Sequence, residues 1–493
     1  MTLPDQTPSA GHVEPAVLQE YRRALNSVGT VREWHLDGFD RTTVPVAATT
    51  WTGADGADAH GVGYGSTWSG AEVGALGEVA ERVVTAQALR ALPSRVATYR
   101  ELATEQGADG VADPLTLTLP AGSKYHPDQA ITWVAAERWR TGEHVWVPVE
   151  FVANDPSGLP TGSPPPLITP ITNGLGAGDT VERAVSHALL ELVQRDGDTV
   201  SFRAMDQGSV IDLDSVTDPI ATETIGLLRR AHIEPVVKLA SDEFACVVYA
   251  MGRDNDVSPP PPPLALTAIG EASHPDGQTA IAAALLEFAS SRARRAFAFG
   301  PLEVLADLLP DYLAQEMTLP VGEQEPRALR EMRKWSTMST SEQRQLAEPM
   351  LGHQVRRIDV SDLPAAEPRL TANPPALLEL MLRRLAAFDV LTVVGRIGGI
   401  FAAKVLVPGL EVETMSYLRI GGRVLVRLLE RGSPLVGLGP PDRPSRLPVR
   451  LTEDALDAIG GPAWLDRDLV ESTVGELYPL YREPRRHAVG RLV

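Results

Sequence analysis

The feature that most constrains the fold of this chain is a pattern that occurs three times. In each copy a glycine-containing loop leads into the frame Ala-x-x-x-Ala-Leu-x-Glu. The copies span residues 61–82, 173–195 and 269–292. Recurrence of one glutamate in one frame favours a shared site over three unrelated helices. The repeated glutamates are Glu78, Glu191 and Glu287, and the arginines that follow them by four or five residues are Arg82, Arg195 and Arg292.

The three copies have the local chemistry of amphipathic helices. Alanines one turn apart allow a helix to approach a neighbouring sheet or helix closely. Ser69 with Glu72 has the spacing of a capping box, as has Asp179 with Glu182, and both pairs predict helix starts. Residues i, i+3 and i+4 share a helix face. Two polar groups are therefore expected to project together: Glu78, Glu81 and Arg82 on the first helix, and His187, Glu191, Gln194 and Arg195 on the second.

A single helix with this pattern would ordinarily carry a solvent-exposed stripe of Glu and Arg, which contributes little to stability. Three converging glutamates would repel one another unless cations lay between them. Mg²⁺ with phosphate oxygens meets that requirement. The glycines of GLGAG (174–178) could lie against phosphate at a helix N-terminus. Their spacing, however, matches neither a Rossmann fingerprint nor a Walker A sequence.

Composition excludes several classes of function. Cys246 is the single cysteine, which excludes a disulfide framework and a thiolate zinc site within the chain. The formal net charge of −19 argues against a nucleic-acid partner, which needs a basic face. The sequence has no run of about 20 apolar residues suited to a membrane helix, and its first residues lack the pattern of a signal peptide. We therefore expect a cytoplasmic protein with no membrane partner.

Other stretches predict elements around the three copies. A turn followed by a strand is expected in 35–51, and a hairpin around the turn TGE in 133–152. Residues 301–350 are charged and helix-like, and 388–407 has the pattern of two buried strands around a glycine turn.

The motifs in the three copies resemble those of the YcaO proteins, a family of ATP-dependent enzymes that activate backbone amides of peptides. GALGEVAER at 74–82 is similar to the family motif Ser-x-x-x-Glu-x-x-Glu-Arg. TNGLGAGDTVERAVSHALLELVQRD, which starts at residue 172, is similar to TNGxAAGxTxxEAxxHALxExxERD. IGEASHPDGQTAIAAALLEFASSR, which starts at residue 269, is similar to GxGAHPDPxxALxRALTExxQxR. LDGFDRTTVPV (36–46) and VPGLEVETMSYLRIGGR (407–423) also look like parts of this family.

The resemblance implies an α/β (α+β) fold of the YcaO type, with sheets flanked by helices and three repeated loop–helix elements around one site. It implies a flexible N-terminus at 1–30, an ATP- and Mg²⁺-binding core at 31–405, and a C-terminal part with an extended tail at 406–493. It also implies roles for single residues. Glu78, Glu81, Glu191 and Glu287 would hold Mg²⁺; Glu78, Glu191 and Arg195 would be catalytic; and Gly74, Arg82, His187, Gln194 and Ser290 would bind the nucleotide.

Four positions depart from the family pattern. Each departure removes a side chain or a charge that could meet the nucleotide or the metal in the family. A catalytically inactive scaffold within a peptide-modifying complex therefore stays an alternative to an enzyme. The departures are Gly74 in place of a serine, Gln194 in place of a glutamate, Ala283 in place of an arginine and Ser290 in place of a glutamine.

The function that the resemblance implies is ATP-dependent activation of a backbone amide in a ribosomally synthesised peptide. Azoline (thiazoline or oxazoline) formation by cyclodehydration is the leading reaction, and thioamide or amidine formation are the alternatives. The implied partners are the precursor peptide and a separate leader-peptide-binding ThiF-like protein or a TfuA-like protein. A homodimer is compatible with the chain.

Overall fold

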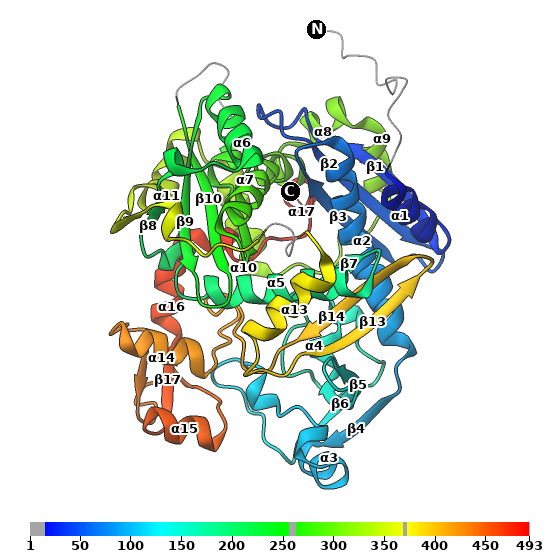
Figure 1. The fold of residues 1–493 in the computed structure, drawn as a ribbon, viewed down its shortest axis with the longest axis vertical. Helices are drawn as coiled ribbons and strands as arrows, with labels where there is room; N and C mark the ends of the chain where they lie inside the picture. Colours follow the sequence, from blue (N-terminus) through cyan, green and yellow to red (C-terminus); the bar gives the residue numbers. More distant parts are fainter. Residues whose placement is uncertain (1–14, 256–262, 368–371, 493) are drawn as a thin grey trace.

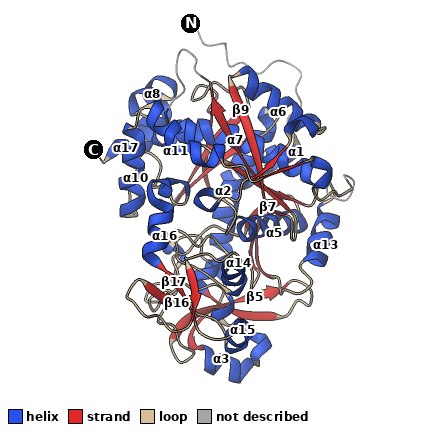
Figure 2. Ribbon diagram, turned by 90° about the vertical axis from the view of Figure 1, so that its left-hand side faces the viewer, coloured by secondary structure: helices blue, strands red, loops and turns tan. Residues whose placement is uncertain are grey.

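The computed structural model describes residues 15–255, 263–367 and 372–492 of the 493-residue chain. Within these residues the chain forms four sheets. Helices cover the outside of the sheets, as Figures 1 and 2 show from two directions. The predicted α/β class, with sheets flanked by helices, is confirmed.

The N-terminal part of the fold is a three-stranded antiparallel sheet in the order β1-β2-β3. Helix α1 packs against α2 and buries Leu18, Tyr21 and Leu25. The sequence predicted a flexible segment at 1–30. Residues 15–30 instead form a helix and the start of a strand, because the apolar side chains of the helix lie one turn apart and pack against α2. Residues 1–14 lie outside the described residues. The elements are α1 (Ala16–Asn26), β1 (Gly29–His35), β2 (Val46–Gly53), β3 (Asp58–Tyr64) and α2 (Trp68–Ala91).

The central sheet has six strands in the order β4-β5-β13-β14-β7, with β6 paired to β5. Two predicted pairs of strands lie in it and are confirmed: β5 with β6 around TGE, and β13 with β14 around two glycines. The strands are β4 (Ser94–Thr98), β5 (Ala130–Arg138), β6 (His144–Pro148), β7 (Leu175–Gly178), β13 (Leu391–Ile397) and β14 (Ile400–Leu406). The helices beside them are α3 (Tyr99–Gln106), α4 (Val149–Val152), α5 (Val181–Asp198) and α13 (Pro374–Arg384).

A third sheet has five strands in the order β11-β10-β9-β8-β12 and is covered by α6 and α7. Four further helices, α8 to α11, occupy most of the region 301–350, as predicted. The strands are β8 (Ser209–Ile211), β9 (Ile233–Ser241), β10 (Cys246–Asp254), β11 (Gly270–His274) and β12 (Arg356–Ile358). The helices are α6 (Pro219–Arg230), α7 (Gly277–Phe299), α8 (Leu302–Leu308), α9 (Pro310–Glu316), α10 (Pro326–Thr337) and α11 (Thr340–Gly352).

The last part of the chain forms a small sheet, β15-β17-β16, which lies with α14, α15 and α16 at the lower left of Figure 1. The chain then returns to the upper body, where α17 contacts α7 and α10. The domain boundary expected at residue 405 stays a prediction. The elements are α14 (Gly422–Glu430), β15 (Val436–Leu438), β16 (Arg446–Pro448), α15 (Glu453–Ile459), β17 (Ala463–Asp466), α16 (Arg467–Val474) and α17 (Ala488–Arg491).

The three sequence copies form three strand–helix units: β3 with α2, β7 with α5, and β11 with α7. The glycines belong to the strands, so the predicted loop–helix element is corrected to strand–helix. A Cβ on Gly63, Gly176 or Gly270 would lie 2.1–2.2 Å from a carbonyl oxygen of the following helix. Glycine in a strand marks such a close backbone approach. The glycines of GLGAG therefore bring helix and strand together, which is a packing role.

The helix starts differ from the capping boxes that the sequence predicted. Thr67 caps α2 and accepts from the N–H of Gly70 at 3.2 Å, and Thr180 caps α5 in the same way from Arg183. The observed caps thus lie two residues before Ser69 and one residue after Asp179, which were the predicted caps. Threonine fulfils the same role because its hydroxyl oxygen can satisfy the free N–H of the third helical residue.

The three units close into a ring. Each helix contacts its own strand and also the strand of the next unit: α2 contacts β7, α5 contacts β11, and α7 contacts β3. In Figure 1 these helices surround the middle of the upper body. The ring brings one face of each of the helices α2, α5 and α7 together. The repeated sequence frame predicted such a shared site but did not define how the helices meet.

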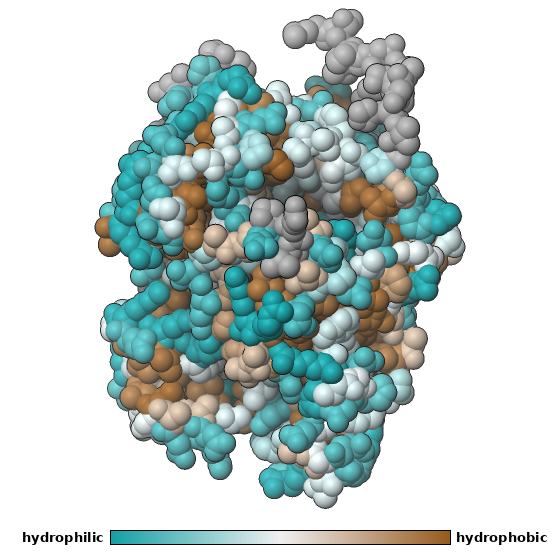
Figure 3. All heavy atoms as spheres, in the orientation of Figure 1, coloured by the Kyte–Doolittle hydropathy of each residue, from teal (hydrophilic) through white to brown (hydrophobic). Residues whose placement is uncertain are grey.

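The surface on the face seen in Figure 3 mixes hydrophilic and hydrophobic side chains without one dominant apolar band. Among the described helices, we find none whose length and apolar character would let it cross a membrane.

Candidate active site

Each of the three repeated glutamates holds the backbone just before its own helix. The carboxylate Oε2 atom accepts a hydrogen bond from a main-chain N–H near the start of the unit. The three glutamates therefore have equivalent positions, as the repeated frame predicted. The N···O distances are 3.1 Å from Val62 to Glu78, 2.9 Å from Gly174 to Glu191 and 3.2 Å from Glu271 to Glu287.

The carboxylates of α2 and α5 meet at one place. Desolvation raises the pKa of Glu78, and the negative charge of Glu191 adds to this effect. Desolvation also raises the pKa of Glu81 well above its usual range, and Glu78 and Glu191 raise it further. Carboxylates that lie close together raise one another's pKa in this way. The predicted convergence of Glu78, Glu81 and Glu191 is therefore present in the fold.

Glu287 on α7 faces the same region from the third unit. Its Oε2 atom accepts a hydrogen bond from the hydroxyl of Tyr64, on β3, at 3.3 Å. Desolvation, followed by the charge of Glu271, raises the pKa of Glu287 to about 8. Tyr64 lies in the field of both Glu287 and Glu78. Strand β3 thus joins the glutamates of the first and third units.

His187 and Arg82 lie at the edge of this acidic group. His187 Nε2 is 3.7 Å from Glu81 Oε1, so it links α5 to α2, although 65% of its side chain is exposed. Arg82 is also exposed, and its positive charge lowers the pKa of Glu78 and of Glu81. Both side chains are placed to meet a ligand that enters from solvent.

The donor set suits Mg²⁺ held together with phosphate better than a metal held by protein alone. Within 15–255, 263–367 and 372–492, no group of three His, Cys, Asp or Glu side chains is compact enough to enclose a metal ion. Mg²⁺ is usually bound by one or two carboxylates together with waters and substrate phosphates. Glu81, a desolvated carboxylate close to Glu78 and Glu191, is a suitable ligand for such an ion.

Glu271, which the sequence analysis did not single out, joins the second and third units. Its carboxylate accepts from Arg195 Nη1 at 2.7 Å, from Arg203 Nη2 at 2.8 Å and from Gln194 Nε2 at 3.2 Å. A glutamate at 194, as in the family motif, would place a second negative charge against Glu271. The one signal in the sequence was an acidic residue directly after the strand glycine of the third copy, in IGEASH.

The third repeated arginine does not reach the site. Arg292 is fully buried and pairs with Asp40 and Asp254, each at 2.8 Å. Arg294 lies closer instead, since its charge interacts with both Glu78 and Glu287. It is seven residues after Glu287, which is about two helical turns and so the same face. The helical period, and not the repeated frame, identifies the arginine that faces the carboxylates.

Two further predicted nucleotide-binding residues are closely packed. Ser290, one turn after Glu287, is 3% exposed. A Cβ on Gly74 would lie 3.1 Å from the Cα of Gly63, so the missing side chain allows the tight contact between α2 and β3. Their roles toward a nucleotide stay predictions.

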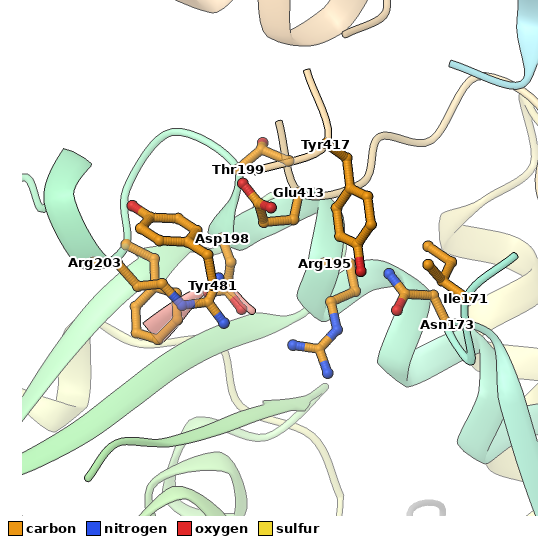
Figure 4. Close-up of a pocket in the computed structure, with 10 residues that line it drawn as sticks. Ile171, Asn173, Arg195, Asp198, Thr199, Arg203, Glu413, Tyr417 and Tyr481 are labelled. Carbon is orange, nitrogen blue, oxygen red and sulfur yellow. The ribbon is translucent and has the colours of Figure 1, made fainter. Parts of the chain in front are cut away.

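A cavity of about 170 Å³ lies beside Arg195. Figure 4 shows its walls, which come from four separate parts of the chain. Asn173 precedes β7, Asp198 ends α5, Tyr417 follows β14, and Tyr481 belongs to the C-terminal segment. Buried Lys404 donates to the carbonyl oxygen of Ile171 at 2.7 Å and so holds the segment that carries Asn173.

Arg203 has an uncommon backbone conformation at the cavity wall. Its φ of 55° lies in the left-handed region, which costs a non-glycine residue free energy and is found mainly at functional or tightly determined positions. Its guanidinium lies 4.3 Å from the ring centre of Phe202 and 4.9 Å from that of Tyr481. Stacking and the ion pair with Glu271 hold this side chain in place.

The C-terminal segment supports the site as well as lining it. Glu483 accepts two hydrogen bonds from Arg294, at 2.6 Å and 3.1 Å. Arg482 lies 4.4 Å from the ring centre of Tyr417. Residues near 480, far in sequence from the three copies, therefore fix the arginine that faces Glu78 and Glu287.

Comparison with known proteins agrees with these observations. Residues 62–411 match the model of the family described as YcaO cyclodehydratase, ATP- and Mg²⁺-binding. An uncharacterised protein of Methanothermobacter thermautotrophicus is 29% identical over 420 residues, which are 83% of this chain and 96% of that protein. An uncharacterised protein of Mycobacterium tuberculosis is 27% identical over 196 residues, which are 40% of this chain and 42% of that protein.

Two solved structures have a similar fold. One is the structure of YcaO from Methanopyrus kandleri bound with AMPPCP and Mg²⁺, with a TM-score of 0.56 and 20% identity; the match covers 83% of this chain and 94% of that one. The other is a heterocyclase in complex with substrate and cofactor, with a TM-score of 0.61 and 17% identity; the match covers 84% of this chain and 55% of that one. At these identities the likeness concerns the fold.

Proposed function

Because this chain belongs to the YcaO family, whose model spans residues 62–411, we propose that it is an ATP- and Mg²⁺-dependent enzyme that activates a backbone amide of a ribosomally synthesised peptide. The leading reaction is azoline formation by cyclodehydration. The observation that carries the proposal is the ring of three strand–helix units, which directs Glu78, Glu191 and Glu287 toward one region.

The residues present fit a metal–phosphate site. Glu78, Glu81, Glu191 and Glu287 would hold Mg²⁺ and keep it against phosphate oxygens. The ion would offset the desolvation and the repulsion from Glu78 and Glu191 that together raise the pKa of Glu81. Arg82, Arg195 and Arg294 are near enough to these carboxylates to orient phosphate groups. Positioning and charge neutralisation dominate phosphoryl transfer, so a site of carboxylates and arginines suffices.

When bound, ATP with Mg²⁺ would supply the phosphoryl group that turns the amide oxygen into a leaving group. The protein's own contribution would be orientation and charge. Glu191 and Arg195, which lie 3.4 Å apart, would set the positions of metal and phosphate. Gln194, which donates from Nε2 to Glu271, would offer the metal only an uncharged amide oxygen. Glu271 places a carboxylate next to position 194, where this chain lacks the glutamate of the family motif. This neighbouring charge supports an enzyme over an inactive scaffold.

The solved structures of similar fold support the cofactor. The structure from Methanopyrus kandleri holds AMPPCP with Mg²⁺, and the heterocyclase holds substrate and cofactor. The separate ThiF-like or TfuA-like partner, the homodimer and the cytoplasmic location stay predictions.

Calorimetry with AMPPCP and Mg²⁺ tests the proposal. We expect saturable binding to the wild type and at least a tenfold loss, about 1.4 kcal/mol, in Glu191→Ala. Glu182→Ala, at the start of the same helix, is the matched control and should bind as the wild type does. If the wild type binds no nucleotide when Mg²⁺ and a precursor peptide are also present, the enzyme proposal is wrong.

A further inference from the structure

The central sheet is open along one edge of strand β13. Strands β5 and β13 pair only where Glu137 meets Thr392 and Arg138 meets Leu391, and beyond these pairs they diverge. Residues 393–397 pair with β14 on one side, and no strand among the described residues pairs with them on the other. In Figure 1, β13 and β14 lie side by side at the right of the central sheet. An open strand edge is a template for another extended chain.

The turn after β13 shows which backbone groups face this open edge. Ile397 pairs with Ile400 across a turn of two residues, and residues that flank such a turn exchange both of their hydrogen bonds. Bonded and non-bonded pairs alternate along an antiparallel ladder, so Val394 and Arg396 direct their N–H and C=O groups away from β14. Within 15–255, 263–367 and 372–492, no loop or turn backbone bonds to these groups. Val394 is 38% exposed, and Arg396 is exposed as well.

A cleft of about 650 Å³ follows the open edge. Its volume lies within the roughly 300–1,000 Å³ of pockets that hold a ligand. Val84, Ala88 and Ala91 of α2 form one wall, and Ala135 of β5 lies across from β13. Because β5 and β13 remain paired at one end, the cleft has the shape for a single extended chain. The edge of a whole second sheet, as in a dimer of this chain, would not enter it.

The two faces of β13 define the side chains that an added strand would need. Alternate residues of a strand lie on opposite faces. Gly395 faces α2, since a Cβ there would lie 2.7 Å from the carbonyl oxygen of Val84 and 2.9 Å from the Cβ of Ala88. Every second side chain of an added strand would therefore meet the small apolar side chains of α2. The others would share the exposed face of Val394 and Arg396, so aliphatic and polar residues should alternate.

The charge at the open edge selects an acidic residue. Arg396 donates from Nε to the carbonyl oxygen of Gly398 at 2.7 Å, and its guanidinium lies 5.0 Å from the ring centre of Phe401. No carboxylate in the described part of the chain forms an ion pair with it, although the whole chain has a net charge of −19. Opposite charges directly across two strands stabilise their pairing. An acidic side chain across from Arg396 would therefore complete this edge.

We propose that the open edge of β13 docks an extended segment of the peptide substrate, which adds as an antiparallel strand with an acidic side chain opposite Arg396. The inference rests on the proposed function, since the activated amide would belong to the same peptide. Helix α2 carries both places: Glu81 and Ala88 are seven residues apart, which is about 10 Å along a helix. About three extended residues span that distance. The docked segment is thus a part of the peptide that is not itself modified.

A short peptide designed for this register tests the proposal. The probe is fluorescein-Val-Glu-Val-Thr-Val-amide, whose glutamate would lie opposite Arg396 and whose threonine would lie opposite Val394. Fluorescence anisotropy with the full chain measures its binding. One analogue has N-methyl groups on the glutamate and threonine amides, which would donate to β13. The matched control has them on the second and third valine amides, which would point away from β13.

We expect the first analogue to bind at least about tenfold more weakly than the parent peptide, because two hydrogen bonds are lost. The control analogue should retain most of its affinity. Equal losses for the two analogues, or no binding of the parent peptide, would overturn the proposal.

Two substitutions test the protein side of the same contact. Val394→Pro removes an N–H that faces the open edge, where proline is tolerated, and should weaken binding at least about tenfold. Val394→Ala keeps the N–H and is the control. If circular dichroism shows that Val394→Pro does not fold, Arg396→Glu decides: it should reverse the preference for the glutamate peptide over the same peptide with lysine in that place. An unchanged preference would contradict the docking edge.

Two further measurements separate the alternatives. A dimer that Val394→Pro converts to a monomer in analytical ultracentrifugation would mean that a second copy occupies the edge, and would overturn the proposal. Calorimetry with AMPPCP and Mg²⁺ on the same samples separates the edge from the proposed function. Peptide binding without nucleotide binding would support the edge and contradict the enzyme, whereas nucleotide binding without peptide binding would contradict the edge alone.

Discussion

Gln194 on α5 donates a hydrogen bond from Nε2 to the Oε2 atom of Glu271 on β11, over 3.2 Å. The pair joins the second and third strand–helix units. It also places a carboxylate, at a position that the family motif leaves open, opposite position 194, where the motif has a glutamate.

Exchanging this pair tests whether the charge is shared between the two positions. Gln194→Glu alone should weaken AMPPCP–Mg²⁺ binding and lower the free energy of unfolding, because two carboxylates would then face each other. Glu271→Gln alone removes the carboxylate that pairs with both Arg195 and Arg203, and breaking a buried ion pair costs about 3–5 kcal/mol. The double exchange should recover a good part of both losses.

Calorimetry and urea unfolding of the four proteins measure this coupling as a double-mutant cycle. Strictly additive losses would show that the two residues act independently, contrary to our expectation.

The strand glycines should be intolerant of a side chain. In Gly176→Ala the new Cβ would lie 2.1 Å from the carbonyl oxygen of Ala184. We expect destabilisation of about 1–3 kcal/mol, which is usual for overpacking. Gly422→Ala is the control, since a Cβ there has no neighbour within 4 Å. Urea unfolding of both variants compares the losses, and an unaffected Gly176→Ala would contradict the close approach of α5 to β7.

Glu411 should make stability fall as the pH rises. Desolvation raises its pKa to about 7, above the value of about 4.3 for an exposed glutamate. Between these two pH values the folded state holds a proton that the unfolded state has released. Unfolding free energy from this group therefore decreases with rising pH, by at most about 1.4 kcal/mol per unit.

Glu411→Gln removes the titrating proton and should flatten the dependence. The variant starts less stable, because Glu411 accepts from the N–H groups of Gly421 and Val424. The informative quantity is therefore the slope of unfolding free energy against pH, from urea titrations between pH 5 and 8. An unchanged slope would mean that another group titrates.

The C-terminal segment should affect nucleotide binding through Arg294. Glu483→Gln weakens the two-point ion pair that holds this arginine, so we expect a several-fold loss of AMPPCP–Mg²⁺ affinity with the fold retained. Glu379→Gln removes an exposed pair with Arg383 at 3.3 Å and is the matched control, since such surface pairs contribute little. Calorimetry compares the two, and equal effects would argue against a positioning role for Glu483.

Local patterns in the sequence predicted a large part of this protein. The glycines, paired alanines and repeated glutamates are governed by helical and strand periodicity, which acts over a few residues. They therefore identified the three units and Glu78, Glu191 and Glu287. The observed helix caps differ from the predicted ones because several neighbouring residues can cap a helix. The prediction for Arg292 was wrong because the fifth residue after Glu287 does not lie on the same helix face.

The sequence by itself thus determined the three units and the carboxylates that they carry. Only the tertiary structure decided which other groups meet them: Glu271 from a neighbouring strand, Arg294 held by Glu483, and Tyr417 and Tyr481 at the cavity beside Arg195. These contacts join segments tens to hundreds of residues apart, and they depend on the closure of the ring and the return of the C-terminal segment. The helical and strand periods of the sequence do not predict these contacts, because packing between the units determines them.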